Sequence, residues 1–158
     1  MHDQDEIFMR QALALAAQGI EQGHGGPFGA VVVMEGEVIG RGWNQVIQHN
    51  DPTAHAEVQA IRMACQTIGH FHLTGATLYT TCEPCPMCMG ALYWARIKRM
   101  VYAASSEDAA EFGFDDRLFK EQVGKPIEEQ MLQVAQRLRS DSRQLFQQWF
   151  QSDKRIDY

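Results

Sequence analysis

Three cysteines and one histidine have the residue types and spacing of a metal site. Cys82, Cys85 and Cys88 form a C-x-x-C-x-x-C run, and His55 precedes them in the chain. Thiolate sulfur and imidazole nitrogen are ligands that zinc binds in proteins. If His55, Cys85 and Cys88 are the ligands, the fourth tetrahedral position stays open for water, which is typical of a catalytic zinc site. The sequence therefore predicts one Zn²⁺ per chain, held by these three residues.

The cysteine run allows three other interpretations, which the spacing disfavours. A structural zinc shell would add Cys82 as a fourth ligand, but closed shells usually combine two separated ligand pairs. An iron–sulfur run of the ferredoxin type needs a cysteine four positions after Cys88, where this chain has Leu92. A thioredoxin-like motif would use Cys85 and Cys88 alone and would leave His55 unexplained. Cys82 is therefore expected to be a buried core residue.

Glu57 is the candidate general acid–base group, because it stands two residues after His55 near the start of a predicted helix. Asp51 and Pro52 suit the cap and the first position of that helix, and Gly69 marks its end. On an ideal helix, residues i and i+2 do not share a face. His55 and Glu57 therefore converge only if the metal lies over the helix end and Glu57 reaches the bound water from the side. The alternative is a solvated surface glutamate.

The elements that must position these residues follow from the periodicity of the apolar residues and from the glycines and prolines between them. Helices are predicted over 3–20 and 52–68, strands over 29–34, 38–43, 76–81 and 99–104, and a polar loop over 44–53. A loop with Pro84 and Pro86 is expected to lead into a further helix, whose one face comprises Cys88, Ala91, Leu92 and Ala95. The apolar face of the 52–68 helix comprises Val58, Ile61, Cys65 and Ile68. Further on, helices are predicted over 106–112 and 143–151, and a helix or a strand over 131–136.

Strands separated by helices imply right-handed crossovers and a partly parallel sheet. The predicted fold is a three-layer α/β/α sandwich with a mixed central sheet. Helices that follow strands of one direction begin at the same sheet edge, where sites of α/β proteins usually lie. His55 and the cysteines are expected to meet there.

The composition of the chain limits the classes of protein to which it can belong. The chain has 158 residues, of which 45% are hydrophobic and 22% charged, as in an ordinary globular domain. No apolar run approaches the roughly 20 residues of a membrane span. Residues 1–10 lack the apolar stretch of a signal peptide, so we expect a cytoplasmic location and no membrane partner.

The chain is acidic, and its charged residues are unevenly distributed along the sequence. The net charge is −6, which argues against a nucleic-acid partner, since such partners are bound by basic patches. Residues 1–116 hold 6 basic and 14 acidic residues, whereas residues 117–158 hold 8 basic and 6 acidic residues. The C-terminal part is thus suited to dock on an acidic body, its own or a partner's, although scattered solvated charges are the plainer interpretation.

The zinc motif resembles that of a known superfamily. H-x-E followed by P-C-x-x-C is the signature of the zinc deaminases, and here it reads His55-Ala-Glu57 and Pro84-Cys85-Pro-Met-Cys88. The chain is therefore similar to the cytidine deaminase superfamily, and within it to the bacterial guanine deaminases. The segments that carry the likeness are GGPFGA at 25–30, DPTAHAE at 51–57, EPCPMC at 83–88, YWAR at 93–96 and GFDD at 113–116, together with Tyr158.

The resemblance implies hydrolytic deamination of guanine to xanthine with release of ammonia. Zinc is expected to lower the pKa of a water molecule towards about 7, so that it attacks C2 of the purine. Glu57 would move protons from that water to ring N3 and to the departing amine. Asp116 would accept hydrogen bonds from the 2-amino and N1 edge and help to move protons. The alternative for Asp116 is a loop-capping aspartate.

Three further residues are implied as substrate contacts. Asn44 would hydrogen-bond the purine from the end of the second strand, Phe28 would stack on the ring, and Ala56 would lie against the substrate. The alternatives are a turn role for Asn44, which is common where strands end, and core packing for Phe28.

The resemblance also implies a homodimer. Residues 1–158 would form a single deaminase domain whose segment 120–158 is exchanged between subunits, with Tyr158 closing the partner's active site. Trp149 and Phe150 are apolar anchors suited to such a contact. The alternative is a tail folded on its own subunit.

Other functions share the same motif. tRNA adenosine deaminases carry the same zinc and Pro-Cys residues, and guanosine deaminases are similar as well, so the motif defines the reaction class rather than the substrate. A binding module with a structural zinc is the non-enzymatic alternative. Glu57 argues against it, because a structural site needs no acid–base group.

Overall fold

The computed structural model describes residues 2–158, which form two compact units. The first unit ends at Lys120 and contains the sheet, and the second comprises Glu121–Tyr158. Within the described residues, no helix combines the length and the apolar character that crossing a membrane requires.

The sheet has four strands in the order β2-β1-β3-β4. Strand β1 (Gly29–Met34) pairs antiparallel with both β2 (Glu37–Trp43) and β3 (Thr77–Cys82). Strand β4 (Arg99–Ala104) pairs parallel with β3, as the intervening helix requires. The predicted mixed sheet is confirmed. Because β2 and β3 both oppose β1, the strands β2, β3 and β4 all run in one direction.

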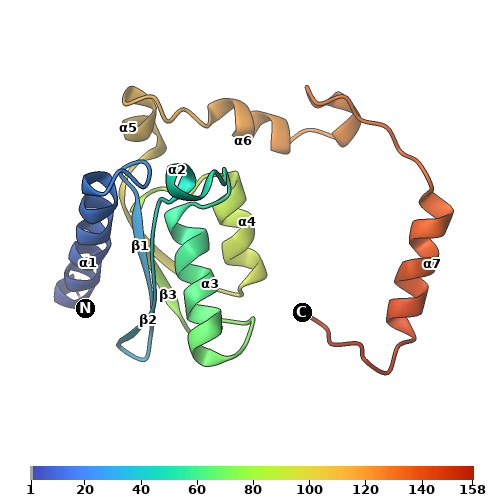
Figure 1. Cartoon of the computed structure of the whole chain (residues 1–158), viewed down its shortest axis with the longest axis horizontal. Helices are drawn as coiled ribbons and strands as arrows, with labels where there is room; N and C mark the ends of the chain where they lie inside the picture. Colours follow the sequence, from blue (N-terminus) through green and yellow to red (C-terminus); the bar gives the residue numbers. More distant parts are fainter. Residues whose placement is uncertain (1) are drawn as a thin grey trace. The chain divides into compact units, whose positions relative to one another are not determined.

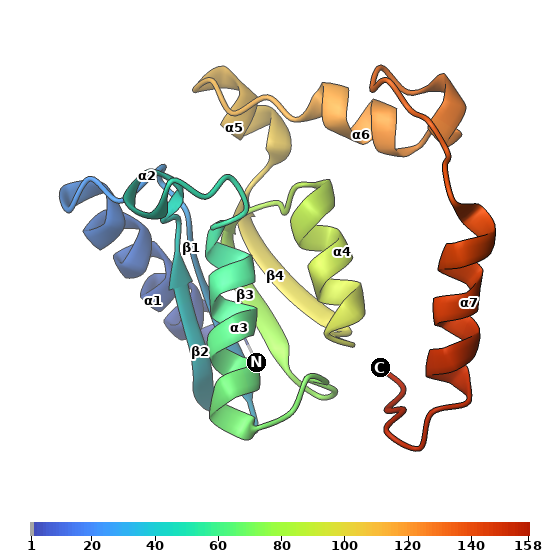
Figure 2. The same cartoon turned by 45° about the vertical axis from the view of Figure 1, so that its right-hand side comes forward.

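Helices cover both faces of this sheet (Figure 1). Helix α1 (His2–Glu21) lies on one face, and α3 (Ala56–Ile68) and α4 (Pro86–Trp94) lie on the other. The predicted three-layer sandwich is therefore confirmed. Helix α3 follows β2 and α4 follows β3, so both helices begin at the same edge of the sheet, as Figure 2 shows.

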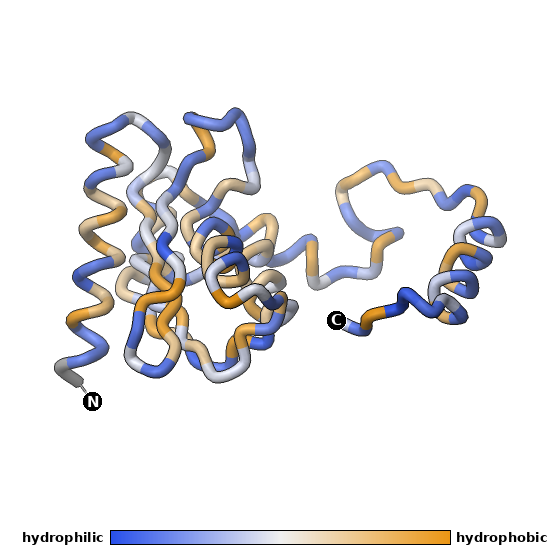
Figure 3. The backbone as a smooth tube through the Cα atoms, turned by 60° about the horizontal axis from the view of Figure 1, so that its bottom comes forward, coloured by the Kyte–Doolittle hydropathy of each residue, from blue (hydrophilic) through white to orange (hydrophobic). Residues whose placement is uncertain are grey.

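The core consists of the two central strands and the helix faces that pack on them. Val31 and Val33 of β1 point towards α1, where they pack with Tyr79 and the partly buried Phe8. The alternate residue Val32 belongs to the cluster on the α3 and α4 side. This period of two is that of a strand buried on both faces, and the tube in Figure 3 shows the hydrophobic residues gathered along the strands.

The predicted start of the zinc-motif helix is wrong. Asp51 does not cap it, because its carboxylate accepts hydrogen bonds from the backbone nitrogen (2.8 Å) and the hydroxyl (2.7 Å) of Thr53. This closes a local turn, a role that aspartate fills as readily as a helix cap. Helix α3 begins only at Ala56, and the predicted loop before it contains a short helix, α2 (Val46–His49).

The predicted buried face of α3 is also wrong in part. Of the four predicted residues only Ile61 is buried, and the helix instead buries a row of alanines. The cause lies in β2, where a Cβ atom on Gly40 would stand 2.2 Å from the carbonyl oxygen of Ala60, and one on Gly42 would stand 2.1 Å from that of Ala56. Glycine and alanine thus let the helix backbone lie directly on the strand.

The C-terminal elements agree with the prediction only in part. The predicted helix at 106–112 is α5 (Ser106–Glu111), and the one at 143–151 is α7 (Arg139–Phe150), which begins earlier. Helix α6 (Arg117–Val123) and a 3₁₀ turn over Ile127–Glu129 were not expected. The prediction of a helix or strand over 131–136 is wrong, because the segment forms neither. No residue of the second unit is buried, so no local core imposes regular structure on it.

Candidate active site

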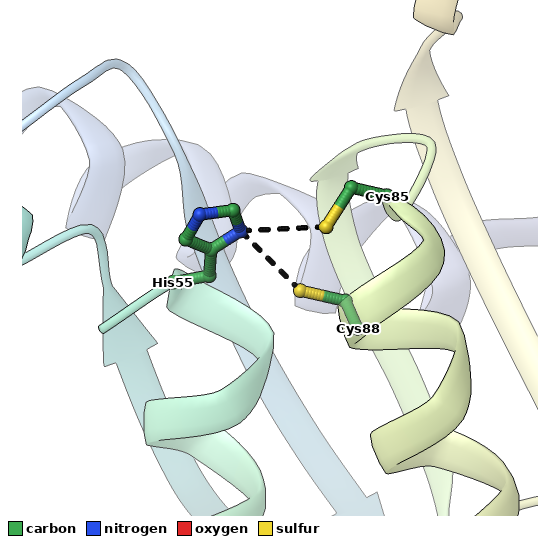
Figure 4. A group of neighbouring side chains, drawn as sticks. All are labelled: His55, Cys85 and Cys88. Carbon is green, nitrogen blue, oxygen red and sulfur yellow. Dashed lines mark hydrogen bonds between the residues drawn. The ribbon is translucent and has the colours of Figure 1, made fainter. Parts of the chain in front are cut away.

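The structure brings the three predicted ligands together at the edge where α3 and α4 begin. Nδ1 of His55 lies 3.6 Å from Sγ of Cys85 and 3.5 Å from Sγ of Cys88. Their ligand atoms lie within 4.8 Å of one another, the only such group that could hold a metal among the described residues. Figure 4 shows His55 reaching from the start of α3 towards the two thiols of α4. One nitrogen and two sulfurs at this spacing match the ligand set of a zinc site with an open position.

Two helix N-termini position these ligands. His55 and Cys85 are the N-cap residues of α3 and α4, with extended backbones (ψ 153° and 169°), and Pro86 then opens α4. Cys88 follows in the first turn of α4, so both thiols stand at the positive end of that helix. The helix dipole favours the thiolate form, which is the form that binds metal.

The thiols are electrostatically coupled. The pKa of Cys85 falls to about 4, chiefly because the Cys88 thiol donates a hydrogen bond to its sulfur and secondly because of His55. The pKa of Cys88 is raised, since it donates that bond and is buried. The bond to Cys85 also raises the pKa of His55. The lowered pKa of Cys85 favours its thiolate form, and one nitrogen with two sulfurs fits Zn²⁺.

Cys82 lies outside this ligand group. Its thiol is buried and donates to the carbonyl oxygen of Ser105 at 3.6 Å. Burial is the main cause that raises its pKa to about 11, so the thiol stays protonated. The geometry therefore favours an open three-ligand site over a closed shell that includes Cys82.

Glu57 is buried beside the ligands, with only 6% of its surface exposed. Its Oε2 lies 3.4 Å from Sγ of Cys88 and is an alternative acceptor for the one proton of that thiol, and its Oε1 accepts from Oγ1 of Thr80 at 3.3 Å. Burial raises the pKa of its carboxyl group. The geometric difficulty of the i, i+2 pair disappears, because His55 is a cap residue and not part of the helix. The surface-glutamate alternative is wrong.

Thr80 is a site residue that the sequence reasoning missed. It is fully buried in β3, and besides Glu57 its hydroxyl can donate to the carbonyl oxygen of Cys82 at 3.2 Å. A hydroxyl in the middle of an otherwise buried strand is the signal that could have identified it, because a buried polar group needs a partner.

Asn44 follows β2 and is 7% exposed. Its Oδ1 accepts hydrogen bonds from the backbone nitrogens of Gly26 (3.3 Å) and Val46 (3.2 Å). Asn44 thus joins two loops and turns its amide NH₂ away from them. Phe28 packs against the core on one side, and its ring meets that of Phe114 edge-on, with centroids 4.8 Å apart.

Asp116 carries a buried oxygen with an unusual environment. Its side chain is 14% exposed, and its Oδ1 accepts no hydrogen bond from the described residues, with the Lys120 ammonium 3.5 Å away. Lys120 also lies 3.3 Å from Oε1 of Glu83, the residue before the Pro-Cys motif. The capping role falls instead to Asp115, which accepts from the backbone nitrogen of Arg117. Lys120 was missed, although its i, i+4 spacing from Asp116 is typical of a helical ion pair.

The two remaining predicted contacts differ in where they lie. Ala56 is fully buried as the first residue of α3, where backbone N–H groups have no partner within the helix. Tyr158 belongs to the second unit, and its ring is largely exposed. Its contact with an active site stays a prediction.

A histidine, two cysteines and a buried glutamate at two helix starts of an α/β/α sandwich define a zinc-dependent deaminase site. Residues 2–104 match the family described as the cytidine and deoxycytidylate deaminase zinc-binding region, and the chain belongs to this family. It is 50% identical over 144 residues to a guanine deaminase of Bacillus subtilis, which covers 91% of this chain and 92% of that protein.

Two further relatives place the chain within the family. The X-ray structure of guanine deaminase from Bacillus subtilis matches with a TM-score of 0.92 and 48% identity, over 97% of this chain and 98% of that one. A tRNA-specific adenosine deaminase of Buchnera aphidicola is 43% identical over 117 residues, which is 74% of this chain and 77% of that protein. The resemblance seen in the motifs is thereby confirmed.

Proposed function

We propose that this protein is a guanine deaminase that converts guanine and water to xanthine and ammonia. The observation that carries the proposal is the identity of half the residues, over 91% of the chain, with the Bacillus subtilis guanine deaminase. The site supports it, because it combines a ligand set for zinc with a buried carboxylate. A structural-zinc module would have no use for that buried carboxylate.

Glu57 is the proton carrier in this proposal. When bound, zinc activates a water molecule as a nucleophile. Glu57 takes a proton as the water oxygen bonds to C2 of guanine, and delivers it to ring N3. The hydroxyl now on C2 gives up its proton, which reaches the exocyclic amine as the C2=O bond forms and the C2–N bond breaks with loss of neutral ammonia. Burial raises the pKa of Glu57, which brings it closer to the working range of a general acid–base group.

The polar groups around the ligands complement guanine. The buried oxygen of Asp116 offers an acceptor for the N–H groups of the 2-amino and N1 edge. The NH₂ of Asn44 offers a donor for an acceptor atom of the purine, because its oxygen is already used. Phe28 would stack on the ring, and Ala56 would line the pocket from the start of α3.

Release of ammonia from different substrates tests this proposal. Guanine should be deaminated faster than guanosine or cytosine, and far faster than adenosine in a tRNA anticodon loop. The body of the chain is acidic and repels a polyanion, because residues 1–116 hold 14 acidic residues against 6 basic ones. A protein that prefers the tRNA substrate would belong to the other branch of the family. The matched Glu57→Gln protein, which keeps the ligands, shows how much of the ammonia comes from this site.

We further propose a cytoplasmic homodimer that exchanges residues 120–158, so that Tyr158 closes the partner's site. The exchange is supported by the second unit, which buries no residue of its own. Its helix α7 exposes large apolar side chains, among them Phe146 (70%) and Phe150 (67%), which need a covering surface. Four free cysteines suit a reducing compartment.

A further inference from the structure

A side-chain pair outside the zinc motif ties together the two loops that meet at Asn44. Nε1 of Trp43, at the end of β2, donates a hydrogen bond to Nδ1 of His24 at 3.0 Å. The two rings lie nearly parallel, with an angle of 22° between their planes. His24 stands in the turn after α1, and Trp43 directly precedes Asn44.

The indole of Trp43 is held against α1. A Cβ atom on Gly19 would lie 2.8 Å from Cδ1 of Trp43, so a side chain at position 19 would collide with the indole ring. The same residue accepts a hydrogen bond from the backbone nitrogen of His24 at 3.0 Å. Gly19 therefore holds both partners of the pair, and the pair cannot shift without moving the end of α1.

The backbone of His24 reaches the segment on the other side of Asn44. Its carbonyl oxygen accepts from the nitrogens of Ile47 (3.1 Å) and Gln48 (3.0 Å). These N–H groups belong to the first turn of α2 and have no partner within that helix. His24 thus contacts the chain both just before and just after Asn44.

This arrangement determines which face of the Asn44 amide is free. Gly25 follows His24, and a Cβ atom there would lie 2.0 Å from Oδ1 of Asn44. The backbone nitrogens of Gly26 and Val46 both donate to that oxygen. With the loop in this place, the amide oxygen is enclosed and the NH₂ group points outward. If the loop moves, the amide can rotate and present its oxygen to a purine acceptor, which repels it.

We propose that His24, through its bond with Trp43, is a positioning residue that fixes the Asn44 amide as a hydrogen-bond donor to the purine. The inference rests on the proposed function, because it assigns the acceptor to a purine base. It adds a pair of residues that touch neither the metal ligands nor Glu57. The effect should therefore appear in substrate binding rather than in the chemical step.

Three variants test the proposal in steady-state assays with guanine. Trp43→Phe removes the donor and keeps an aromatic ring, and His24→Leu removes the acceptor. Each should raise KM for guanine about three- to tenfold, the effect of one hydrogen bond, with kcat changed less than twofold and zinc content unchanged. His24→Asn should restore most of the affinity, because its amide oxygen can replace Nδ1 as the acceptor.

A double-mutant comparison separates positioning from loss of stability. In an Asn44→Ala background, His24→Leu should leave KM unchanged, because the group that it orients is gone. Tyr79→Phe is the control, since it removes the hydrogen bonds of the Tyr79 hydroxyl, to Asp5 (2.7 Å) and from Arg99 (3.2 Å), on the α1 side of the sheet; KM should not change.

Several results would overturn the inference. It fails if His24→Leu raises KM equally in the Asn44→Ala background, or if the Tyr79→Phe control raises KM as much. If the unmodified protein deaminates guanine and all three variants have its KM, the inference is also overturned, but the proposed function stays intact. An unmodified, zinc-loaded protein that releases no ammonia from guanine overturns both.

Discussion

The two units of the chain differ in what stabilises them. The first unit has a cluster of buried apolar residues on each face of its sheet, and every described residue that is buried belongs to this unit. The second unit, Glu121–Tyr158, buries none of its residues, although α7 carries Leu145, Phe146 and Trp149. The first unit thus contains the fold and the chemistry, whereas the second has apolar groups whose burial needs another surface. Changes in the first unit should alter catalysis, and changes in the second should alter assembly and closure.

Loss of a ligand should have the largest effect. Cys88→Ser should lower zinc content, measured by metal analysis, and abolish ammonia release, because a serine hydroxyl is a poor zinc ligand. Cys82→Ser is the matched control from the same run, and it should keep the zinc and the activity, since Cys82 lies outside the ligand group. Zinc loss in the Cys82 variant would contradict the open-site assignment.

Glu57→Gln should have the second-largest effect on activity. The variant should fold and keep its zinc, because glutamine has nearly the same shape and the residue is not a ligand. Turnover of guanine should fall about 10²- to 10⁴-fold, the range for a positioned acid–base group. Zinc analysis and ammonia release from the same preparation measure both effects. Turnover close to that of the unmodified protein would remove Glu57 from the mechanism.

Deletion of residues 154–158 tests the second unit. We expect a folded, zinc-loaded protein whose guanine turnover is about 10- to 100-fold lower, because an open site admits water and holds the substrate loosely. Since the core lies entirely in the first unit, the unfolding temperature should change little. An active truncated protein would show that the segment has no part in closure.

A mixing experiment tests whether the proposed closure acts between two subunits. When Glu57→Gln chains are refolded together with truncated chains, mixed dimers contain one site with an intact Glu57 and the partner's Tyr158. Activity should then reappear, although each parent is nearly inactive. Mixed dimers that stay inactive would indicate closure within one subunit.

The smallest effect should follow from Thr80→Val, which removes the hydroxyl that donates to Glu57 but nearly keeps the side-chain volume. We expect kcat to fall about three- to tenfold, as for the loss of one hydrogen bond. Thr81→Val is the matched control. It removes the acceptor of the Gly29 nitrogen at 3.1 Å, so it should lower stability without lowering kcat. Equal losses of kcat in both variants would mean that Thr80 acts only through stability.

The local parts of the site could be predicted from the sequence. The spacing of the ligands in the Pro-Cys motif indicates the metal, because the pattern extends over only a few residues. The alternation of strands and helices indicates the sheet edge at which the ligands meet. The start of α3 could not be located, because Asp51 suits a turn and a helix cap equally well. That error concealed how His55 and Glu57 converge.

Contacts between distant segments were beyond sequence reasoning. Thr80 and Glu57 are 23 positions apart, Lys120 and Glu83 are 37 apart, and Trp43 and His24 are 19 apart. No periodicity of a single element links such residues, because the link arises only when the elements pack. The apolar residues of α7 likewise suggest burial, but the sequence does not say against which surface, so both an intersubunit contact and a tail on its own subunit were left open.

The glycine and alanine contact between β2 and α3 limits which substitutions the strand can accept. The two backbones pack directly there, because carbonyl oxygens of α3 stand where a side chain on Gly40 or Gly42 would begin. Replacements of glycine by alanine, which often stabilise proteins, are therefore closed to Gly40 and Gly42. The loops that carry Phe28, Asn44 and Asp116 are separate segments. Substitutions in these loops should therefore leave α3, and with it His55, seated on the sheet.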